Sequence, residues 1–463
     1  MSALPEPDVL KTALPGQEPI CRVGLVLEED NKTAIEMELP LGKFKLTGGK
    51  DEKLIKCDAP VKLKIKVNER HVIADDVSGD TLIKSPGLIG IESMDRDEKV
   101  GPKSGILLKG VVAGRGFHWQ KEVDLFFPHR LEFHHRHGKL IVVNVVPMEI
   151  YLACVVTSEM SSKCPPEFIK AQATAARSWM LVFLKNKHLG EPFSICNDDC
   201  CQRYQGTTFL NEAVSKSVSA TSGMCILTKE GFVCGAYYSK SCGGIMERAQ
   251  NIFGEGALGL GEAIDAPDKS PTKDFNPITE DNIREWVTGD IVKKIDSFCS
   301  PRICPEESLP DYLGAVDEAG HYFRWKVEYT REKMVELMRK KMGLHDASEF
   351  LDFSPGSRGN SGRLHELYLL YRKRGGDVAV HTIKTQYQIR NALHDKFLFS
   401  SGFIWDYERN AKGRITKIIL QGAGWGHGAG LCQIGALGMA LEGFSYEDIL
   451  KHYYSTSSLV QAY

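Results

Sequence analysis

The chain has 463 residues, enough to bury the cores of two or three domains. Its 58 basic residues nearly balance its 60 acidic residues, so composition speaks against a protein that neutralises nucleic-acid phosphates. No apolar run approaches a membrane span, and residues 1–19 contain no signal-peptide pattern. We therefore expect no nucleic-acid partner and no transmembrane segment. The protein is then either intracellular or one whose leader has been removed.

In chain order, the pattern predicts an N-terminal tail (1–19), a β-rich region (20–145) and a mixed helical and β region (146–463). The β-rich region alternates apolar and polar residues, as in "VKLKIKV" and "GILLKGVV". Two helices are expected next, in "PMEIYLACVVTSEM" and in "PPEFIKAQATAARSWMLVFLKNKH", whose prolines suit a first turn. A polar segment at about 255–320 reads as an insertion, and "SGRLHELYLLYRKRGGDVAVHTIK" predicts a β-hairpin.

Thirteen cysteines are an odd number spread over the chain, which is not the pattern of a small disulfide scaffold. One group differs, because "CNDDCCQRYQG" places Cys196, Cys200 and Cys201 within six residues. Three sulfurs need a fourth ligand for tetrahedral zinc, and His188 lies upstream to supply it. The alternative interpretation is reduced thiols, or a disulfide beside a thiol.

The stretch "LQGAGWGHGAGLCQIGALGMA" at 420–440 contains seven glycines around one tryptophan and one histidine. Glycine weakens regular structure, so such a run indicates a close approach to the main chain. The spacing formally fits a dinucleotide-binding fingerprint, but no βαβ unit follows, and no Walker lysine does either. Phosphate binding is therefore not expected.

Glu159 ends the apolar stripe of the first predicted helix. Burial on that stripe, and the negative end of the helix dipole, both predict a raised pKa for this carboxyl group. A carboxyl that stays protonated near neutral pH is what a general acid requires. The alternative is a structural glutamate that forms a cap or pairs with Arg177 or Lys163 across the turn between the two helices.

Several motifs occur together in the order typical of one family: "VPMEIYLACVVTSEM", "KAQATAAR", "CQRYQG", "YYSKSCGG", "SGRLHEL", "FLFSSGFIW" and "GWGHGAGLCQIGALGMA". In these blocks the chain resembles the stage II sporulation protein D (SpoIID/LytB) family over about residues 140–455, and "GRGFHW" extends the likeness toward the N-terminus. The resemblance implies an α+β fold, in which the β-rich region packs on a catalytic region completed by the C-terminal Gly-rich block.

The family resemblance implies a lytic transglycosylase that cuts peptidoglycan glycan strands, with Glu159 as the acid/base. The C6 hydroxyl of N-acetylmuramic acid would act as nucleophile and give a 1,6-anhydro end, so no second carboxylate and no cofactor are required. Asp198, Asp199 and Glu247 are the other carboxylates to consider. The alternative, from the family's other branch, is a non-catalytic glycan-binding protein that enhances an N-acetylmuramoyl-L-alanine amidase.

The same resemblance implies a glycan groove with the glycines as its floor. Its expected residues are Ser239, Ser241, Cys242, Gly243, Gly424, Trp425, Gly426, His427, Gly428 and Gln433. A core tryptophan and a histidine bonded to the main chain are the alternatives for Trp425 and His427. Some members bind zinc through a Cys…His-Cys arrangement with an upstream histidine. Here Cys200 stands in the place of that histidine, so a structural zinc ion is one interpretation only.

The partners implied are peptidoglycan strands and a cell-wall amidase, and the location implied is the cell envelope. The N-terminal residues show no leader that would explain export, which leaves a cytoplasmic location open.

Overall fold

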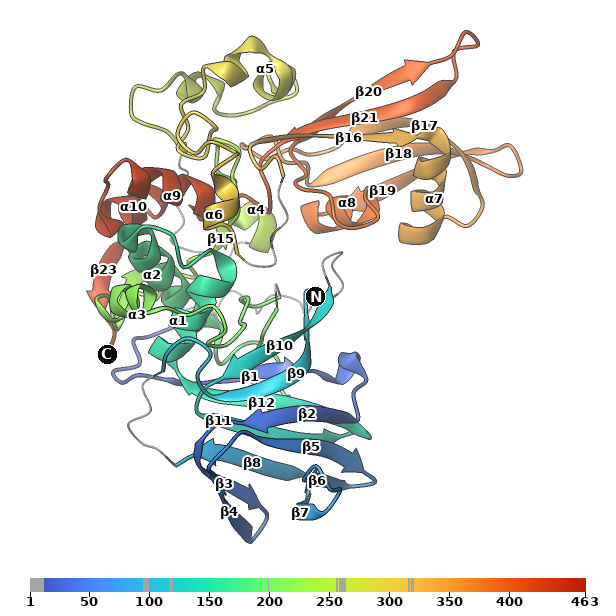
Figure 1. Ribbon diagram of the computed structural model, residues 1–463. Helices are drawn as coiled ribbons and strands as arrows, with labels where there is room; N and C mark the ends of the chain where they lie inside the picture. The colour runs from blue at the N-terminus through green and yellow to red at the C-terminus, as the bar shows by residue number, and fades with distance from the viewer. Residues whose placement is uncertain are drawn as a thin grey trace.

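The computed structural model describes residues 12–94, 100–115, 120–198, 200–254, 257, 264–314, 317 and 320–463. Figure 1 shows two N-terminal sheets at one end, a helical middle part, and a second group of sheets at the other end. The predicted α+β class and the β-rich N-terminal region are confirmed. No helix in the described ranges is both long and apolar enough to cross a membrane.

The N-terminal region forms a seven-stranded sheet, β13-β1-β12-β11-β8-β3-β4, and a six-stranded sheet, β10-β9-β2-β5-β6-β7. Alternation explains their packing: in "VKLKIKVN", Leu63 and Ile65 are buried while the lysines between them point outward. The strands are β1 (Ile20–Val26), β2 (Ala34–Leu39), β3 (Gly42–Gly48), β4 (Asp51–Cys57), β5 (Val61–Asn68), β6 (His71–Asp75), β7 (Thr81–Pro86), β8 (Leu88–Ser93), β9 (Ile106–Ala113), β10 (Lys121–Phe127), β11 (Arg130–Arg136), β12 (Lys139–Pro147) and β13 (Ile195–Cys196), with the short helix η2 (Glu28–Asp30) after β1.

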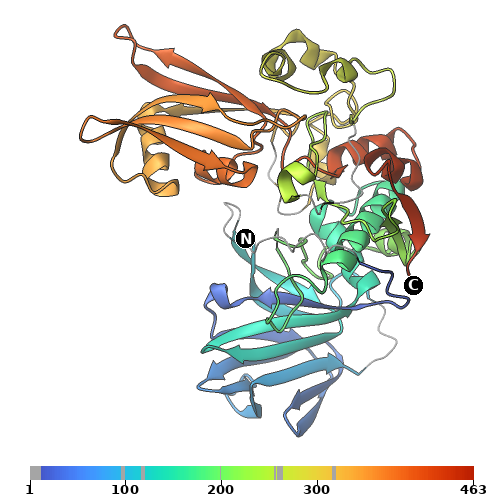
Figure 2. The same ribbon diagram turned by 180° about the vertical axis from the view of Figure 1, so that it is seen from behind.

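The helical middle part is built from two segments that lie far apart in the sequence, residues 148–219 and 433–453. Both predicted helices are present, and the second begins with proline in its first turn. Helix α2 contacts the two C-terminal helices α9 and α10, which Figure 2 shows beside it from behind. The helices are α1 (Met148–Glu159), α2 (Pro166–Phe183), α3 (Glu212–Ser219), α9 (Gln433–Leu441) and α10 (Tyr446–Tyr453).

Two short strand pairs join these ends. Strand β14 (Met224–Leu227) pairs with β23 (Ser458–Gln461), and β15 (Tyr238–Ser239) pairs in parallel with β22 (Leu431–Cys432). The second pair places the "YYSKSCGG" block directly beside the Gly-rich block. Between them in sequence lie the short helices α4 (Gln250–Phe253), η3 (Pro271–Phe275), α5 (Ile283–Thr288), η4 (Asp290–Lys293) and α6 (Leu309–Tyr312).

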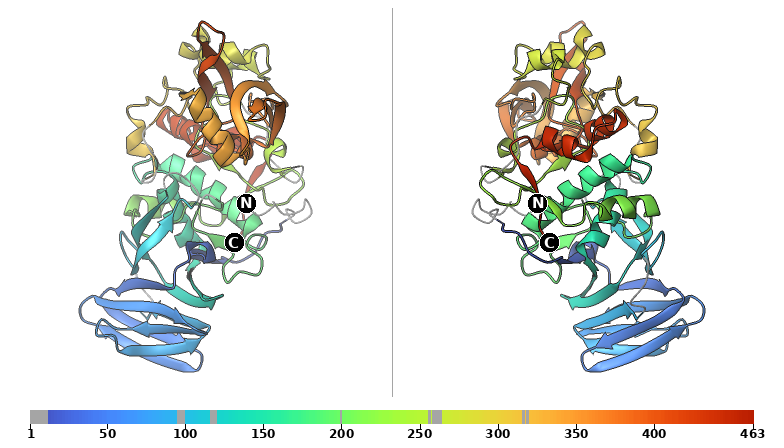
Figure 3. Two further views of the ribbon diagram at one scale, coloured as in Figure 1. Left: turned by 90° about the vertical axis from the view of Figure 1, so that its right-hand side faces the viewer. Right: turned by 90° about the vertical axis from the view of Figure 1, so that its left-hand side faces the viewer.

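Residues 324–423 contain two three-stranded sheets, β16-β21-β20 and β17-β18-β19, with an apolar core of their own that includes Met338, Leu369 and Ile418. The predicted hairpin is confirmed as β18 and β19. Figure 3 shows these sheets at the end of the molecule opposite the N-terminal sheets. The elements are β16 (Arg324–Thr330), α7 (Arg331–Lys341), β17 (Ala347–Pro355), β18 (Glu366–Lys373), β19 (Val378–Lys384), α8 (Gln386–Ala392), β20 (Phe403–Arg409) and β21 (Ile415–Ala423). The sequence analysis included them in its region 146–463 without separating them, and its domain limits stay predictions.

Candidate functional site

Glu159 is the last residue of α1, and only 8% of its surface is exposed. Ten of the twelve residues of α1 are buried, so the helix lies inside the protein on all its faces, and Glu159 is buried with the rest of it rather than by an apolar stripe. Its carboxylate Oε1 accepts hydrogen bonds from the main-chain N–H of Arg203 at 3.1 Å and from the hydroxyl of Tyr238 at 3.3 Å. The sequence predicted a buried carboxyl group at this position, and the structure buries it.

The two cations considered as structural partners of Glu159 bind other carboxylates. Arg177 donates to Glu149 at 2.8 and 2.7 Å. Lys163 donates to Asp311 at 2.6 Å. The alternative of a Glu159 paired with Arg177 or Lys163 is therefore wrong.

A buried ionic network adjoins the end of α1. Lys240 Nζ donates to the main-chain oxygen of Glu159 at 2.8 Å and to Asp317 Oδ2 at 2.7 Å. Asp317 also accepts from Arg203 Nη1 at 2.7 Å. Burial opposes ionisation of Asp317, but Lys240 and Arg203 hold its pKa below the ordinary value. A lysine at a helix C-terminus also offsets the negative end of the helix dipole, which the sequence argument had treated as uncompensated.

Tyr238 and Lys240 were not among the residues predicted from the sequence, although both lie in the quoted block "YYSKSCGG". The residues predicted from this block include Ser239 and Ser241. Successive side chains of an extended segment point to opposite sides, so Tyr238 and Lys240 share the side that faces the end of α1. The alternation of side chains along the segment could have identified Tyr238 and Lys240. Asp317, which binds Lys240, comes from a segment with no motif and could not have been identified in this way.

The two predicted serines contact the Gly-rich block. Ser239 Oγ accepts from the main-chain N–H of Gly428 at 3.2 Å. The main chain of Ser241 exchanges two hydrogen bonds with that of Trp425, at 3.0 and 2.8 Å. The structure therefore brings these predicted residues together, through contacts between the two blocks.

His427 is bonded to the main chain on both sides of its ring. Nδ1 accepts from the N–H of Ala429 at 3.1 Å, and the ring also bonds to the main chain of Tyr238. Burial, with the nearby Arg390 and Arg363 cations, lowers the pKa of His427 to about 3. The ring is therefore neutral at neutral pH. These contacts are those of the structural role weighed in the sequence analysis, and substrate binding stays a prediction.

The glycines of the block pack against the protein itself. A Cβ on Gly428, which has φ of +79°, would lie 2.3 Å from Arg363 Cζ. A Cβ on Gly424 would lie 2.7 Å from Arg363 Nη2. Arg363, missed by the sequence analysis, donates to the carbonyl of Cys242 at 3.2 Å and so ties the two blocks together. Close packing against Arg363 therefore explains why glycines stand in this stretch. Its role as the floor of a glycan groove stays a prediction.

The remaining predicted groove residues lie in packed surroundings. Trp425 stacks on Phe399 at 4.3 Å between ring centroids and contacts Tyr322 at 4.4 Å. Gln433, the first residue of α9, is 2% exposed, and its Nε2 has no hydrogen-bond partner in the part of the chain that the structure describes. Three further residues of the predicted groove also lie against other protein groups. Gly426 lies close to Ser239, and Gly243 lies close to the main chain of Gly424. Cys242 lies close to Asp265.

The four candidate zinc ligands do converge. One ligand atom from each of His188, Cys196, Cys200 and Cys201 lies within 4.8 Å of all the others. His188 Nε2 is 3.3 Å from the sulfur of Cys201 and 3.6 Å from that of Cys200. The sulfur of Cys196 is 3.1 Å from that of Cys200. One nitrogen and three sulfurs in this arrangement fit a tetrahedral zinc ion.

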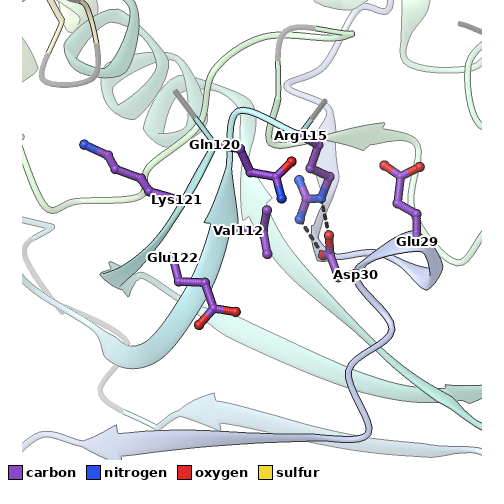
Figure 4. A pocket seen from close by; sticks show the side chains of 7 residues that line it. All are labelled: Glu29, Asp30, Val112, Arg115, Gln120, Lys121 and Glu122. Atoms are coloured by element: carbon purple, nitrogen blue, oxygen red, sulfur yellow. Dashed lines mark hydrogen bonds and ion pairs between the residues drawn. The ribbon is translucent and has the colours of Figure 1, made fainter. Parts of the chain in front are cut away.

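A cavity of about 610 Å³ lies in the N-terminal region (Figure 4). Arg115 borders it and binds Asp30 at 2.6 and 2.7 Å, as the dashed lines show. The main-chain N–H of Arg115 also donates to Asp198 at 2.7 Å. None of the predicted site residues lines this cavity; its walls are Glu29, Asp30, Val112, Arg115, Gln120, Lys121 and Glu122. Within the quoted "GRGFHW", residues 116–119 lie outside the described residues.

The other carboxylates considered are engaged elsewhere. Asp198 binds Arg115, and Asp199 lies outside the described residues. Glu247 is 2% exposed and accepts from Ser361 at 2.6 Å and from Asn251 at 2.7 Å.

Comparison with known proteins finds family models that match two parts of the chain. Residues 136–227, which include Glu159 and the four candidate zinc ligands, match the SpoIID model, described as stage II sporulation protein. Residues 292–430 match a domain of unknown function.

Three relatives match most of the chain. An uncharacterised protein of Brachyspira hyodysenteriae is 26% identical over 321 residues, 69% of this chain and 68% of that protein. Stage II sporulation protein D of Bacillus amyloliquefaciens is 27% identical over 321 residues, 69% of this chain and 76% of that protein. The amidase enhancer of Bacillus subtilis is 23% identical over 307 residues, 66% of this chain and 39% of that protein. Residues 136–227 are thus similar to the stage II sporulation protein D domain, and most of the chain is similar to the relatives named here.

Proposed function

We propose that the protein cleaves peptidoglycan glycan strands as a lytic transglycosylase, with Glu159 as the only acid/base. The observation that supports this most is the position of Glu159: buried at the end of α1, inside the matched domain, with Oε1 bound by Tyr238 and the N–H of Arg203.

One carboxyl group is enough for this reaction. Protonated Glu159 would donate its proton to the glycosidic oxygen as the bond to C1 of N-acetylmuramic acid breaks. The resulting carboxylate would then take the proton from the C6 hydroxyl of the same sugar, whose oxygen attacks C1. The product is a 1,6-anhydro end, and Glu159 regains its proton.

The neighbouring charges support this assignment over a two-carboxylate hydrolase. Glycosidases of that kind use a second carboxylate roughly 5 to 9.5 Å away as nucleophile or base. Asp317 is the carboxylate that shares Arg203 with Glu159, and it is already bound by two cations at 2.7 Å each. Such pairing makes it a poor nucleophile and a poor base.

Mass spectrometry of the products from purified glycan strands without peptide stems tests the proposal. We expect fragments that end in 1,6-anhydro-N-acetylmuramic acid. Fragments with ordinary reducing ends would instead indicate hydrolysis, and intact strands that bind the protein would indicate a non-catalytic binder.

A second function, enhancement of a cell-wall amidase, is favoured by the similarity to the amidase enhancer of Bacillus subtilis. In that case, glycan binding without cleavage would raise the rate of an added N-acetylmuramoyl-L-alanine amidase on intact sacculi. Both functions place the protein in the cell envelope with peptidoglycan as partner. An amidase assay with wild-type protein separates them, because stimulation without anhydro products fits only the second.

A structural zinc ion is also proposed at His188, Cys196, Cys200 and Cys201, whose donor atoms fit it. With four protein ligands, the site would have no open position for substrate. Its expected effect is to hold the segment after α2 next to α1, where Arg203 reaches Glu159.

A further inference from the structure

A second group of metal-binding side chains lies in the protein interior, apart from the cysteines after α2. It consists of Cys242, Asp265, Cys299 and Cys432, and their ligand atoms all lie within 4.8 Å of one another. All four are at most 3% exposed. Cys242 follows β15, Cys432 ends β22, and the other two come from the segment predicted as an insertion.

The spacing fits a tetrahedral zinc ion. Two sulfurs, each about 2.3 Å from such an ion, lie roughly 3.8 Å apart. The sulfurs of Cys242 and Cys299 are 3.8 Å apart, and Cys242 Sγ is 3.3 Å from Asp265 Oδ2. The three cysteines are unlinked in this arrangement.

Main-chain groups surround the sulfurs as they do in thiolate sites. Cys432 is the N-cap of α9, and its Sγ accepts from the N–H of Gly435 at 3.4 Å and from that of Cys242 at 3.2 Å. Cys242 Sγ accepts from the N–H of Gly244 at 3.3 Å. N–H donors and a helix N-terminus stabilise the thiolate form, which is the form that binds metal.

The carboxylate is oriented in a similar way. Asp265 Oδ1 accepts from the hydroxyl of Tyr453 at 2.5 Å, and Oδ2 accepts from the N–H of Cys299 at 3.1 Å. Such outer contacts fix the direction of a ligating oxygen.

Two guanidinium groups lie beside the cluster. Arg363 is 1% exposed and donates to the carbonyl of Cys242 at 3.2 Å. Arg324 donates to the carbonyl of Gly243 at 2.9 Å, and its hydrogen-bond acceptors within the described ranges are carbonyl oxygens alone. Cations in such surroundings need compensating negative charge. Zinc with three thiolates and one carboxylate carries a net charge of about −2. Arg324 and Arg363 offset part of this charge, and Arg363 also interacts with the buried Glu247 carboxylate.

We propose that Cys242, Asp265, Cys299 and Cys432 bind one zinc ion whose role is structural. Four protein ligands leave no open position. The ion fastens the "YYSKSCGG" and Gly-rich blocks to the segment 264–314, and so supports Tyr238 and Lys240 behind Glu159. This inference is independent of the proposed reaction, because it concerns metal content and stability.

The test separates the two sites by variants. The double variant Cys196→Ser/Cys201→Ser removes the site after α2, and this protein, purified with reductant and without chelator, should hold one zinc per chain by elemental analysis. Adding Cys299→Ser should bring zinc close to zero. Adding Cys304→Ser instead should leave it unchanged, because Cys304 is an equally buried thiol of the same segment whose sulfur contacts the carbonyl of Ile434.

Cobalt substitution gives a second readout on the same proteins. The double variant and its Cys304→Ser derivative should show an intense thiolate-to-cobalt charge-transfer band, and the Cys299→Ser derivative should lose it. If the Cys299→Ser derivative does not fold, Asp265→Asn in the double variant replaces it. This derivative should show a weaker or shifted cobalt band, because one of the four ligands is changed. A folded double variant without zinc would overturn the proposal, as would a disulfide between two of the three cysteines in its non-reduced peptide map.

Discussion

The main-chain partners of His427 give its ring a structural function with a measurable pH signature. The folded state holds its pKa at about 3, whereas an unfolded histidine titrates near 6.5. Between these values the unfolded chain binds a proton that the folded chain does not. The stabilisation is therefore fully present above pH of about 6.5 and is lost progressively as pH falls toward about 3.

We expect wild-type protein to lose on the order of 2 kcal/mol of unfolding free energy through His427 between about pH 7.5 and about pH 5. His427→Asn should be less stable than wild type at the higher pH, because it loses ring contacts. It should also show a smaller loss on acidification. Urea unfolding at both pH values measures this. His137→Asn is the control, since that side chain is 70% exposed. Equal pH dependence in wild type and His427→Asn would contradict the account.

At the scale of elements, the Gly-rich stretch works as a packing surface for Arg363. The guanidinium fits under Gly424 and Gly428 and reaches across to the carbonyl of Cys242. The parallel pair of β15 and β22 then fixes Tyr238 next to the end of α1. Glycine is needed at 424 and 428 because both residues have positive φ and because a Cβ there would overlap Arg363.

Gly428→Ala should therefore destabilise the protein more than an alanine at a glycine with open surroundings. Gly443 is the matched control: it has φ of +88°, and a Cβ there meets nothing within 4 Å. Gly443→Ala should cost about 1 to 2 kcal/mol from backbone strain alone. Gly428→Ala should cost about 1 to 3 kcal/mol more, because its Cβ overlaps Arg363. Urea unfolding compares the two, and equal losses would mean that Arg363 moves aside freely.

At the scale of the whole molecule, periodicity predicted much of the fold but not its spatial grouping. The strands in 20–145, the helices α1 and α2, and the β18–β19 hairpin follow from alternation and helical spacing. The separate core of residues 324–423 does not, because its apolar positions look like those of any other sheet. The burial of Glu159 was predictable from the apolar residues before it, whereas Asp317 and Asp265 come from segments without a pattern. The catalytic and binding roles of the predicted site residues stay predictions.

The described residues form two large apolar cores, one within residues 324–423 and one mainly in the rest of the chain. We expect a mutation in one core to destabilise that region without destabilising the other. Met338 is fully buried in the core of residues 324–423, and Met180 is fully buried on α2 in the other core. Each change to alanine should cost about 2 to 5 kcal/mol locally. Hydrogen–deuterium exchange should rise in β16–β21 for Met338→Ala and in α1 and α2 for Met180→Ala. Exchange that rises everywhere in both variants would show a single cooperative unit.

The central claim is that Glu159 carries the proton in glycan cleavage, and the release rate of 1,6-anhydro products by Glu159→Gln tests it most directly. Glutamine keeps the shape of the side chain and can still accept from Tyr238 and Arg203, but it has no acidic proton to donate. We expect the rate to fall by roughly 10² to 10⁴. Glu212→Gln, at an exposed position on α3, should cleave at the wild-type rate.

Binding to glycan strands without peptide stems should survive in Glu159→Gln, which separates lost chemistry from lost folding. A folded Glu159→Gln protein that releases anhydro ends within a few-fold of the wild-type rate would contradict the account.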